Sequence, residues 1–130
     1  MKHKQILTIA IIISMICFGC EKDADSPSVD FTKDIAGVYT GTWVVVGTGQ
    51  VSGTCEVVKV SSTSVNLEMT AGGQNIPTLP GVKLSDGGNG KIKLIYSDAS
   101  GTLNGTIDNN SIFFTLKAGS IEETFSGTKQ

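Results

Sequence analysis

The clearest evidence for the fold class is the stretch GTLNGTIDNNSIFFTLK, residues 101–117. Apolar and polar residues alternate in both of its halves, as they do in strands that bury one face. The face predicted to be buried carries Leu103, Gly105, Ile107, Ile112, Phe114 and Leu116. Asn109 and Asn110 separate the two halves, and asparagine accepts the positive φ of a tight turn. The stretch therefore predicts a β-hairpin.

The same alternation extends over residues 35–130, and turn-forming residues recur about every ten positions, a spacing typical of sandwiches and barrels. Helical spacing is absent. We predict an all-β domain, a single antiparallel up-and-down barrel of about eight strands. The segment around Pro77 and Pro80 is the weakest strand, because proline cannot donate to a ladder, and we interpret it as one bent strand. The predicted inward side chains are Val65, Leu67, Ile92, Leu94, Leu103, Ile107, Ile112, Phe114 and Leu116.

Three short segments carry a family resemblance. They are IAGVYTGTW at 35–43, GTLNGTID at 101–108 and FSGTK at 125–129. Together they resemble the calycin-like, lipocalin-like small domains of Bacteroidetes-type lipoproteins. The resemblance spans roughly residues 35–129 and implies an up-and-down barrel of about eight strands. It implies no particular activity, since a fold alone does not define one.

The N-terminus has the layout of a secretory signal. Lys2 and Lys4 precede an apolar run, and the segment ends in Gly19-Cys20 before an acidic stretch. This ending resembles a bacterial lipoprotein signal, which predicts cleavage after residue 19 and acylation, including palmitate, of Cys20. The alternative is an uncleaved anchor helix, although the apolar run is shorter than the roughly 20 residues that a spanning helix needs.

Residues 20–34 are polar and acidic, and we predict a flexible tether between the lipid and the barrel. Lys22-Asp23-Ala24-Asp25 resembles the export signals of surface lipoproteins, or else it is an ordinary acidic linker. The expected location is the cell envelope, on the outer membrane, with surface exposure as one alternative.

The composition excludes several classes of function. The only histidine, His3, lies in the expected signal, so the mature chain has no imidazole for a Ser-His or Cys-His pair or for a histidine-ligated metal. Arginine is absent. After loss of Lys2 and Lys4, eight lysines remain against twelve acids, a net charge of −4, which disfavours nucleic-acid binding. We therefore expect no enzymatic activity, no cofactor and no metal.

Few side chains suggest chemistry. Cys55 is interpreted as a buried strand residue, because Glu56 beside it would raise its pKa. Glu122 and Glu123 form the only adjacent acid pair in the predicted barrel. If Ile121 and Phe125 face inward, Glu123 does as well. Alternatively, the register is reversed or broken by a bulge and both acids lie in solvent.

The remaining candidates are aromatic. Tyr39, Trp43, Tyr96 and Phe114 either fill the core or line a pocket for a small apolar ligand. An eight-stranded barrel is wide enough for packed side chains or for one small ligand, and its strand glycines permit either. We expect a monomeric envelope lipoprotein that binds a small apolar molecule. The alternative is a protein-interaction or protease-inhibitor-like module on the membrane surface.

Overall fold

The computed structural model describes residues 29–130. The expected signal peptide, Cys20 and the first part of the expected tether lie outside the described residues. Within residues 29–130 there is no helix that is long and apolar enough to cross a membrane. The strands are β1 (Gly37–Val45), β2 (Gly49–Ser61), β3 (Ser64–Ala71), β4 (Gln74–Gly88), β5 (Lys91–Ser97), β6 (Thr102–Asp108), β7 (Ser111–Ala118) and β8 (Ile121–Lys129).

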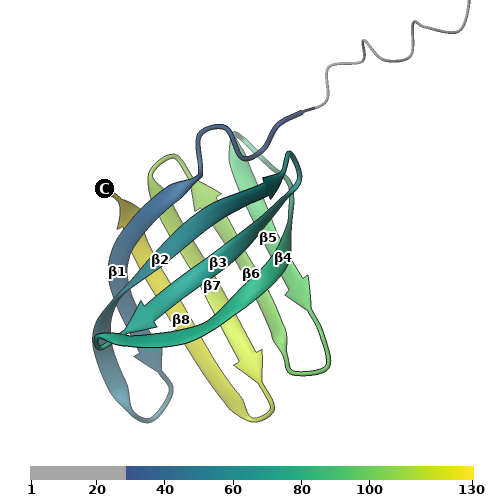
Figure 1. Ribbon diagram of the computed structural model, residues 1–130. Helices are drawn as coiled ribbons and strands as arrows, with labels where there is room; N and C mark the ends of the chain where they lie inside the picture. The colour runs from purple at the N-terminus through teal and green to yellow at the C-terminus, as the bar shows by residue number, and fades with distance from the viewer. Residues whose placement is uncertain (1–28) are drawn as a thin grey trace, which may run out of the picture.

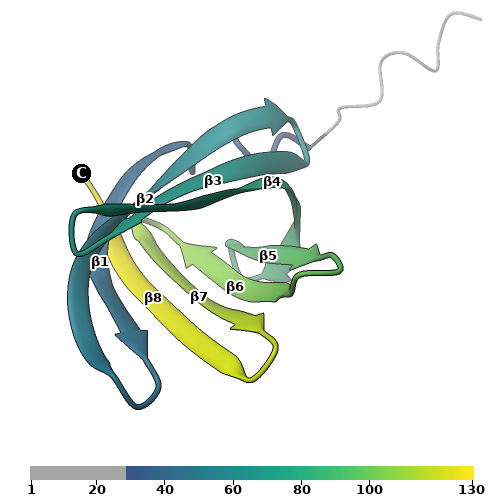
Figure 2. The same ribbon diagram turned by 60° about the horizontal axis from the view of Figure 1, so that its bottom comes forward.

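The eight strands form one closed antiparallel barrel (Figure 1). Each strand pairs with the next, and β8 returns to pair with β1 from Tyr39↔Lys129 to Val45↔Glu123. In Figure 2, β2, β3 and β4 form one wall and β5 to β8 the opposite wall. The predicted all-β, up-and-down barrel is confirmed. Closure removes the unpaired strand edges through which sheets aggregate.

The alternation of apolar residues sets the inner face, as predicted. Val65, Leu67, Leu94, Leu103, Ile107, Ile112 and Phe114 are buried, and Ile92 and Leu116 are partly buried against them. Phe113, next to Phe114, faces outward and is 50% exposed. The predicted turn between β6 and β7 is also confirmed, with Asn109 at a φ of 54°.

β4 is the least regular strand. Its pairing with β3 shifts twice, between Val65 and Leu67 and between Leu67 and Met69. Pro77 and Pro80 cause part of this irregularity, since neither has an N–H to donate. The backbone N–H of Gly81 instead donates to the side-chain oxygen of Asn66 at 3.0 Å. The segment is a single bent strand, as its prolines predict.

Three aromatic rings fill the middle of the barrel. Trp43 meets Phe114 edge-on with ring centroids 5.6 Å apart, and Phe125 lies 5.1 Å from Trp43 and 5.4 Å from Phe114. The strand glycines make room for these rings. A Cβ on Gly53 would lie 2.5 Å from the Trp43 indole, and one on Gly127 would lie 2.9 Å from the Phe125 ring. The space beside Gly53 and Gly127 is therefore filled by aromatic side chains and is not a ligand cavity.

The N-terminal segment 29–36 closes one end of the barrel, at the top in Figure 1. Ile35 is 5% exposed and Thr32 is 1% exposed. The Tyr39 hydroxyl donates to the Ile35 carbonyl at 2.9 Å. Asp30 pairs with Lys59 at 2.7 Å, and this contact, with hydrogen bonds from Thr32, lowers the pKa of Asp30 to about 2. Residues 30–34, assigned to the tether from the sequence, thus pack on the barrel, and the folded domain begins before Ile35.

Candidate ligand pocket at the open end of the barrel

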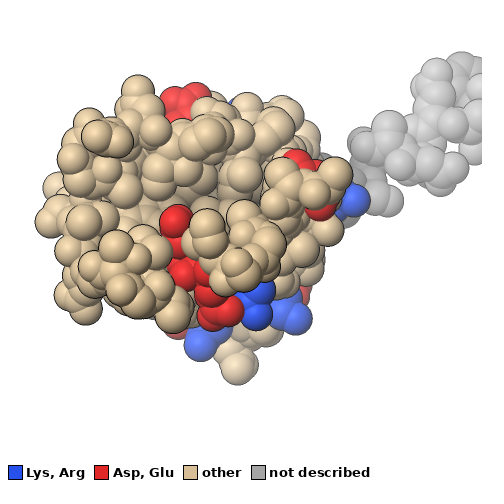
Figure 3. Space-filling model, turned by 90° about the horizontal axis from the view of Figure 1, so that it is seen from below, with Lys and Arg blue, Asp and Glu red and all other residues tan. Residues whose placement is uncertain are grey.

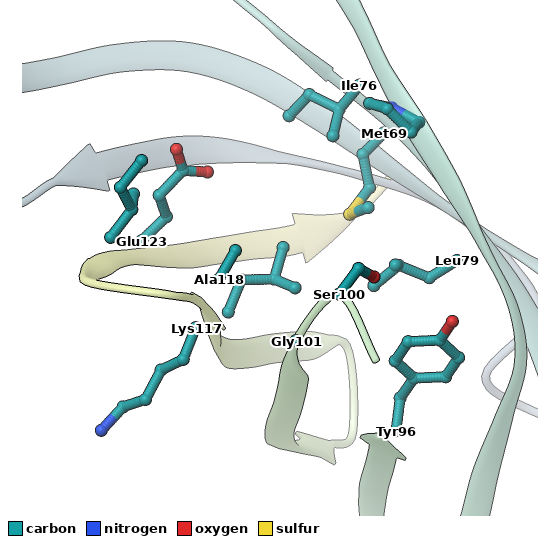
Figure 4. A pocket seen from close by; sticks show the side chains of 12 residues that line it. Met69, Ile76, Leu79, Tyr96, Ser100, Gly101, Lys117, Ala118 and Glu123 are labelled. Atoms are coloured by element: carbon teal, nitrogen blue, oxygen red, sulfur yellow. The ribbon is translucent and has the colours of Figure 1, made fainter. Parts of the chain in front are cut away.

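A cavity of about 260 Å³ lies at the end of the barrel opposite the N-terminal segment (Figure 4). It is bounded by residues of β3, β4, β5, β7 and β8 and by the loop between β5 and β6. Most of its wall is apolar: Met69, Ile76, Pro77, Leu79, Leu116, Ala118 and Ile121, with the ring of Tyr96. Seen from this end, the surface is mostly free of charge around a central hollow, with acidic atoms beside it (Figure 3).

The volume restricts what the cavity holds. Pockets for drug-sized molecules usually measure about 300–1,000 Å³. A cavity of about 260 Å³ is slightly smaller and suits a small apolar molecule or the end of a longer alkyl chain.

Asp98 shapes the rim between β5 and β6. Its carboxylate accepts hydrogen bonds from the backbone N–H of Ser100 at 2.8 Å, from the Ser100 hydroxyl at 2.6 Å and from the N–H of Gly101 at 3.0 Å. The Tyr96 hydroxyl donates to the same carboxylate. The bonds from Ser100 and Tyr96 lower the pKa of Asp98 to about 2, and the bond to Asp98 raises the pKa of Tyr96. Both hydroxyl protons at the pocket are therefore already engaged.

The two charged residues at the pocket point in different directions (Figure 4). Lys117 extends away from the cavity, and its Nζ lies 3.1 Å from a carboxylate oxygen of Glu122. Glu123 projects toward the cavity, because it shares the inner face with Phe125 and is paired with the inward Leu116. Its side chain is half-buried. Of the two alternatives for this acid pair, the inward register of Glu123 holds.

The structure separates the four aromatic residues singled out from the sequence. Tyr96 lines the cavity. Tyr39, Trp43 and Phe114 are fully buried in the core and do not line it. The polar atoms of Trp43 and Tyr39 are engaged in hydrogen bonds within the barrel. The Trp43 indole N–H donates to the Thr70 carbonyl at 2.9 Å, and the Tyr39 hydroxyl donates to the Ile35 carbonyl.

Buried groups offer little reactivity. Desolvation raises the pKa of the Cys55 thiol to about 12, so it remains a neutral, inert core residue, as interpreted from the sequence. Desolvation also raises the pKa of Tyr39 to about 12. Over the described residues, no group of three or more His, Cys, Asp or Glu is placed to hold a metal ion.

Sequence reasoning missed most of the pocket wall. No local pattern marks Met69, Ile76 and Leu79 as pocket residues, and the irregular pairing of β4 conceals which of its side chains point inward. A usable signal was nevertheless present, because inward positions at strand ends that share one end of the barrel line its mouth. Ala118, Ile121 and Glu123 satisfy that rule on β7 and β8.

Comparisons with known proteins find similarity in structure only. No protein-family profile matches the sequence. No curated protein matches it either. A de novo designed fluorescence-activating β-barrel is 15% identical, with 79% of this chain and 100% of that chain covered and a TM-score of 0.49. Lipid binding protein 8 of Caenorhabditis elegans is 13% identical, with coverage of 79% and 100% and a TM-score of 0.45.

A fatty acid binding protein of Schistosoma mansoni, solved in complex with arachidonic acid, is 10% identical, with coverage of 75% and 97% and a TM-score of 0.44. At these identities the likeness concerns the fold alone. The strand order itself defines the architecture: residues 29–130 form a closed antiparallel barrel of eight up-and-down strands.

Proposed function

We propose that this protein is a non-enzymatic lipoprotein of the cell envelope, whose barrel binds a small apolar molecule in the cavity at its open end. The observation that carries the proposal is the apolar wall of that cavity, in a barrel whose middle is otherwise filled by aromatic rings. Burial of apolar surface contributes about 25 cal/mol per Å², so such a wall favours an apolar guest without any catalytic group.

The N-terminal signal supports the envelope location. Acylation of Cys20 would hold the protein on the outer membrane, because each buried methylene of a lipid chain contributes about 0.8 kcal/mol to membrane binding. Segment 29–36, through which the described chain enters the barrel, lies at the end opposite the cavity (Figure 1).

The binding test uses a neutral alkyl probe, 1-octanol. The barrel closes within residues 29–130, so the expected mature chain, residues 20–130 with Cys20→Ser, serves as a soluble form. Octanol should shift amide NMR signals of residues that line the cavity, such as Leu79 and Ala118. Ala118→Phe places a ring in the cavity and should abolish these shifts. Val60→Phe, at a 56% exposed site on β2, is the matched control and should retain them.

Trp43 emission monitors folding in both variants, because the indole lies in the core. Failure of octanol to bind the folded protein would overturn the proposal. The interaction-module hypothesis would then gain support, because three apolar residues are exposed: Val46 in the turn after β1, Val51 near the start of β2 and Ile121 at the start of β8.

A further inference from the structure

We infer that the pocket selects apolar molecules that carry a cationic headgroup, such as a primary amine, over molecules that carry a carboxylate. The inference rests on the proposed apolar pocket and assigns its polarity. The responsible residue is Glu123, whose side chain projects into the cavity (Figure 4).

The cavity has few polar groups in its wall. Four polar side chains border it: Tyr96, Ser100, Lys117 and Glu123. The hydroxyl protons of Tyr96 and Ser100 are donated to Asp98. Lys117 turns outward to Glu122. These two hydroxyls and the Lys117 ammonium are therefore not available as hydrogen-bond donors to the headgroup of a carboxylate ligand.

Glu123 is the half-buried acid of the cavity wall. Within residues 29–130 no hydrogen bond or ion pair joins the carboxylate of Glu123 to another side chain. Lys117, on the neighbouring strand β7, is held on the outer face by Glu122. A half-buried carboxylate without a partner favours a cation and disfavours a second anion, and the effect grows as water is excluded. The absence of arginine from the chain removes the usual bidentate partner of a carboxylate ligand.

Glu123 and most of the apolar wall lie on different strands. Glu123 lies at the β8 end of the wall, whereas Met69, Ile76 and Leu79 lie on the β3 and β4 side. A molecule with its alkyl part against these apolar side chains can place its headgroup at Glu123. The arrangement matches an amphiphile with an amine at one end.

The test compares three probes of one chain length: octylamine, 1-octanol and octanoate. Dissociation constants are measured by calorimetry on residues 20–130 with Cys20→Ser, below the aggregation concentration of each probe. We expect octylamine to bind about tenfold more tightly than octanol and octanoate to bind more weakly than octanol, since each factor of ten corresponds to about 1.4 kcal/mol.

Glu123→Gln keeps the shape of the side chain and removes its charge. We expect it to weaken octylamine about tenfold, to strengthen octanoate and to leave octanol unchanged. Glu56→Gln is the matched control, because it removes the same charge from an exposed residue of β2 that does not line the cavity, and it should leave the order of the probes unchanged.

The outcomes separate this inference from the proposed function. Equal affinities for octylamine and octanoate, or an unchanged preference in Glu123→Gln, would overturn the charge selection while octanol binding upheld the apolar pocket. An equal effect of Glu56→Gln would assign the preference to the net charge of the barrel and also overturn the role of Glu123. Absence of binding by all three probes would overturn both proposals.

Discussion

Phe114 is the residue on which the core depends most directly. Its ring contacts Trp43 and Phe125, and its side chain is fully buried. We predict that Phe114→Ala lowers the free energy of unfolding by about 3–5 kcal/mol, because truncation of a buried phenylalanine leaves a cavity. This loss approaches the whole stability of many small domains. Urea denaturation followed by Trp43 emission measures it.

The neighbouring residue supplies the control. Phe113 is half exposed on the outer face. Phe113→Ala should change the free energy of unfolding by no more than about 0.5 kcal/mol, as is usual for surface substitutions. Equal effects of the two substitutions would contradict the inner-face assignment.

Asp98 gives the pocket rim its dependence on pH. Its pKa is about 2 in the folded protein, against 3.8 for an ordinary aspartate. Because the folded pKa is the lower one, the contribution of Asp98 to stability is present above pH 3.8 and is lost as the pH falls toward 2. We predict that a carboxyl NMR titration of Asp98 has its midpoint near pH 2 and that the Ser100 and Gly101 amide signals move with it. A midpoint near 3.8 would show that these hydrogen bonds do not persist in solution.

The N-terminal segment 29–36 acts as an element although it forms no strand. Ile35 contributes the buried side chain by which this segment closes the barrel. We predict that Ile35→Ala costs about 2–5 kcal/mol of stability and speeds amide exchange in the segment. Lys33→Ala, two residues earlier and exposed, should do neither. If both variants matched the unmodified protein, the segment would be shown to contribute nothing to the fold.

The strands themselves could be predicted from the sequence, whereas of the pocket wall only Tyr96 was predicted. Alternation is a local property, so Leu103, Ile107 and Ile112 reveal their face without reference to any partner strand. The choice between core and pocket depends on how side chains from distant strands meet. Trp43 is buried because Gly53 on β2 and Gly127 on β8 admit the rings around it, and no pattern within β1 contains that information.

At the scale of the whole molecule, the proposed membrane attachment would depend on acylation of one residue, Cys20. We predict that Cys20→Ser moves the protein from the membrane fraction to the soluble fraction, because loss of the acyl chains removes their contribution to membrane binding. Fractionation and mass spectrometry of the mature N-terminus measure this. Cys17→Ser should leave the protein on the membrane, and an unmodified Cys20 in the mature protein would contradict the prediction.

The irregular pairing of β3 with β4 has a consequence for kinetics. The register shifts lie between Val65 and Met69, and Met69 also forms part of the pocket wall together with Ile76 and Leu79. The β2–β3 and β4–β5 pairings each shift once, between Lys59 and Ser61 and between Asp86 and Gly88, whereas the β3–β4 pairing shifts twice. Thermal opening should therefore concentrate between β3 and β4. We predict that amides of residues 76–81 exchange with deuterium faster than those of β6 and β7. A guest would then enter and leave through this seam, and its residence time would follow the opening rate of β4 rather than the width of the mouth.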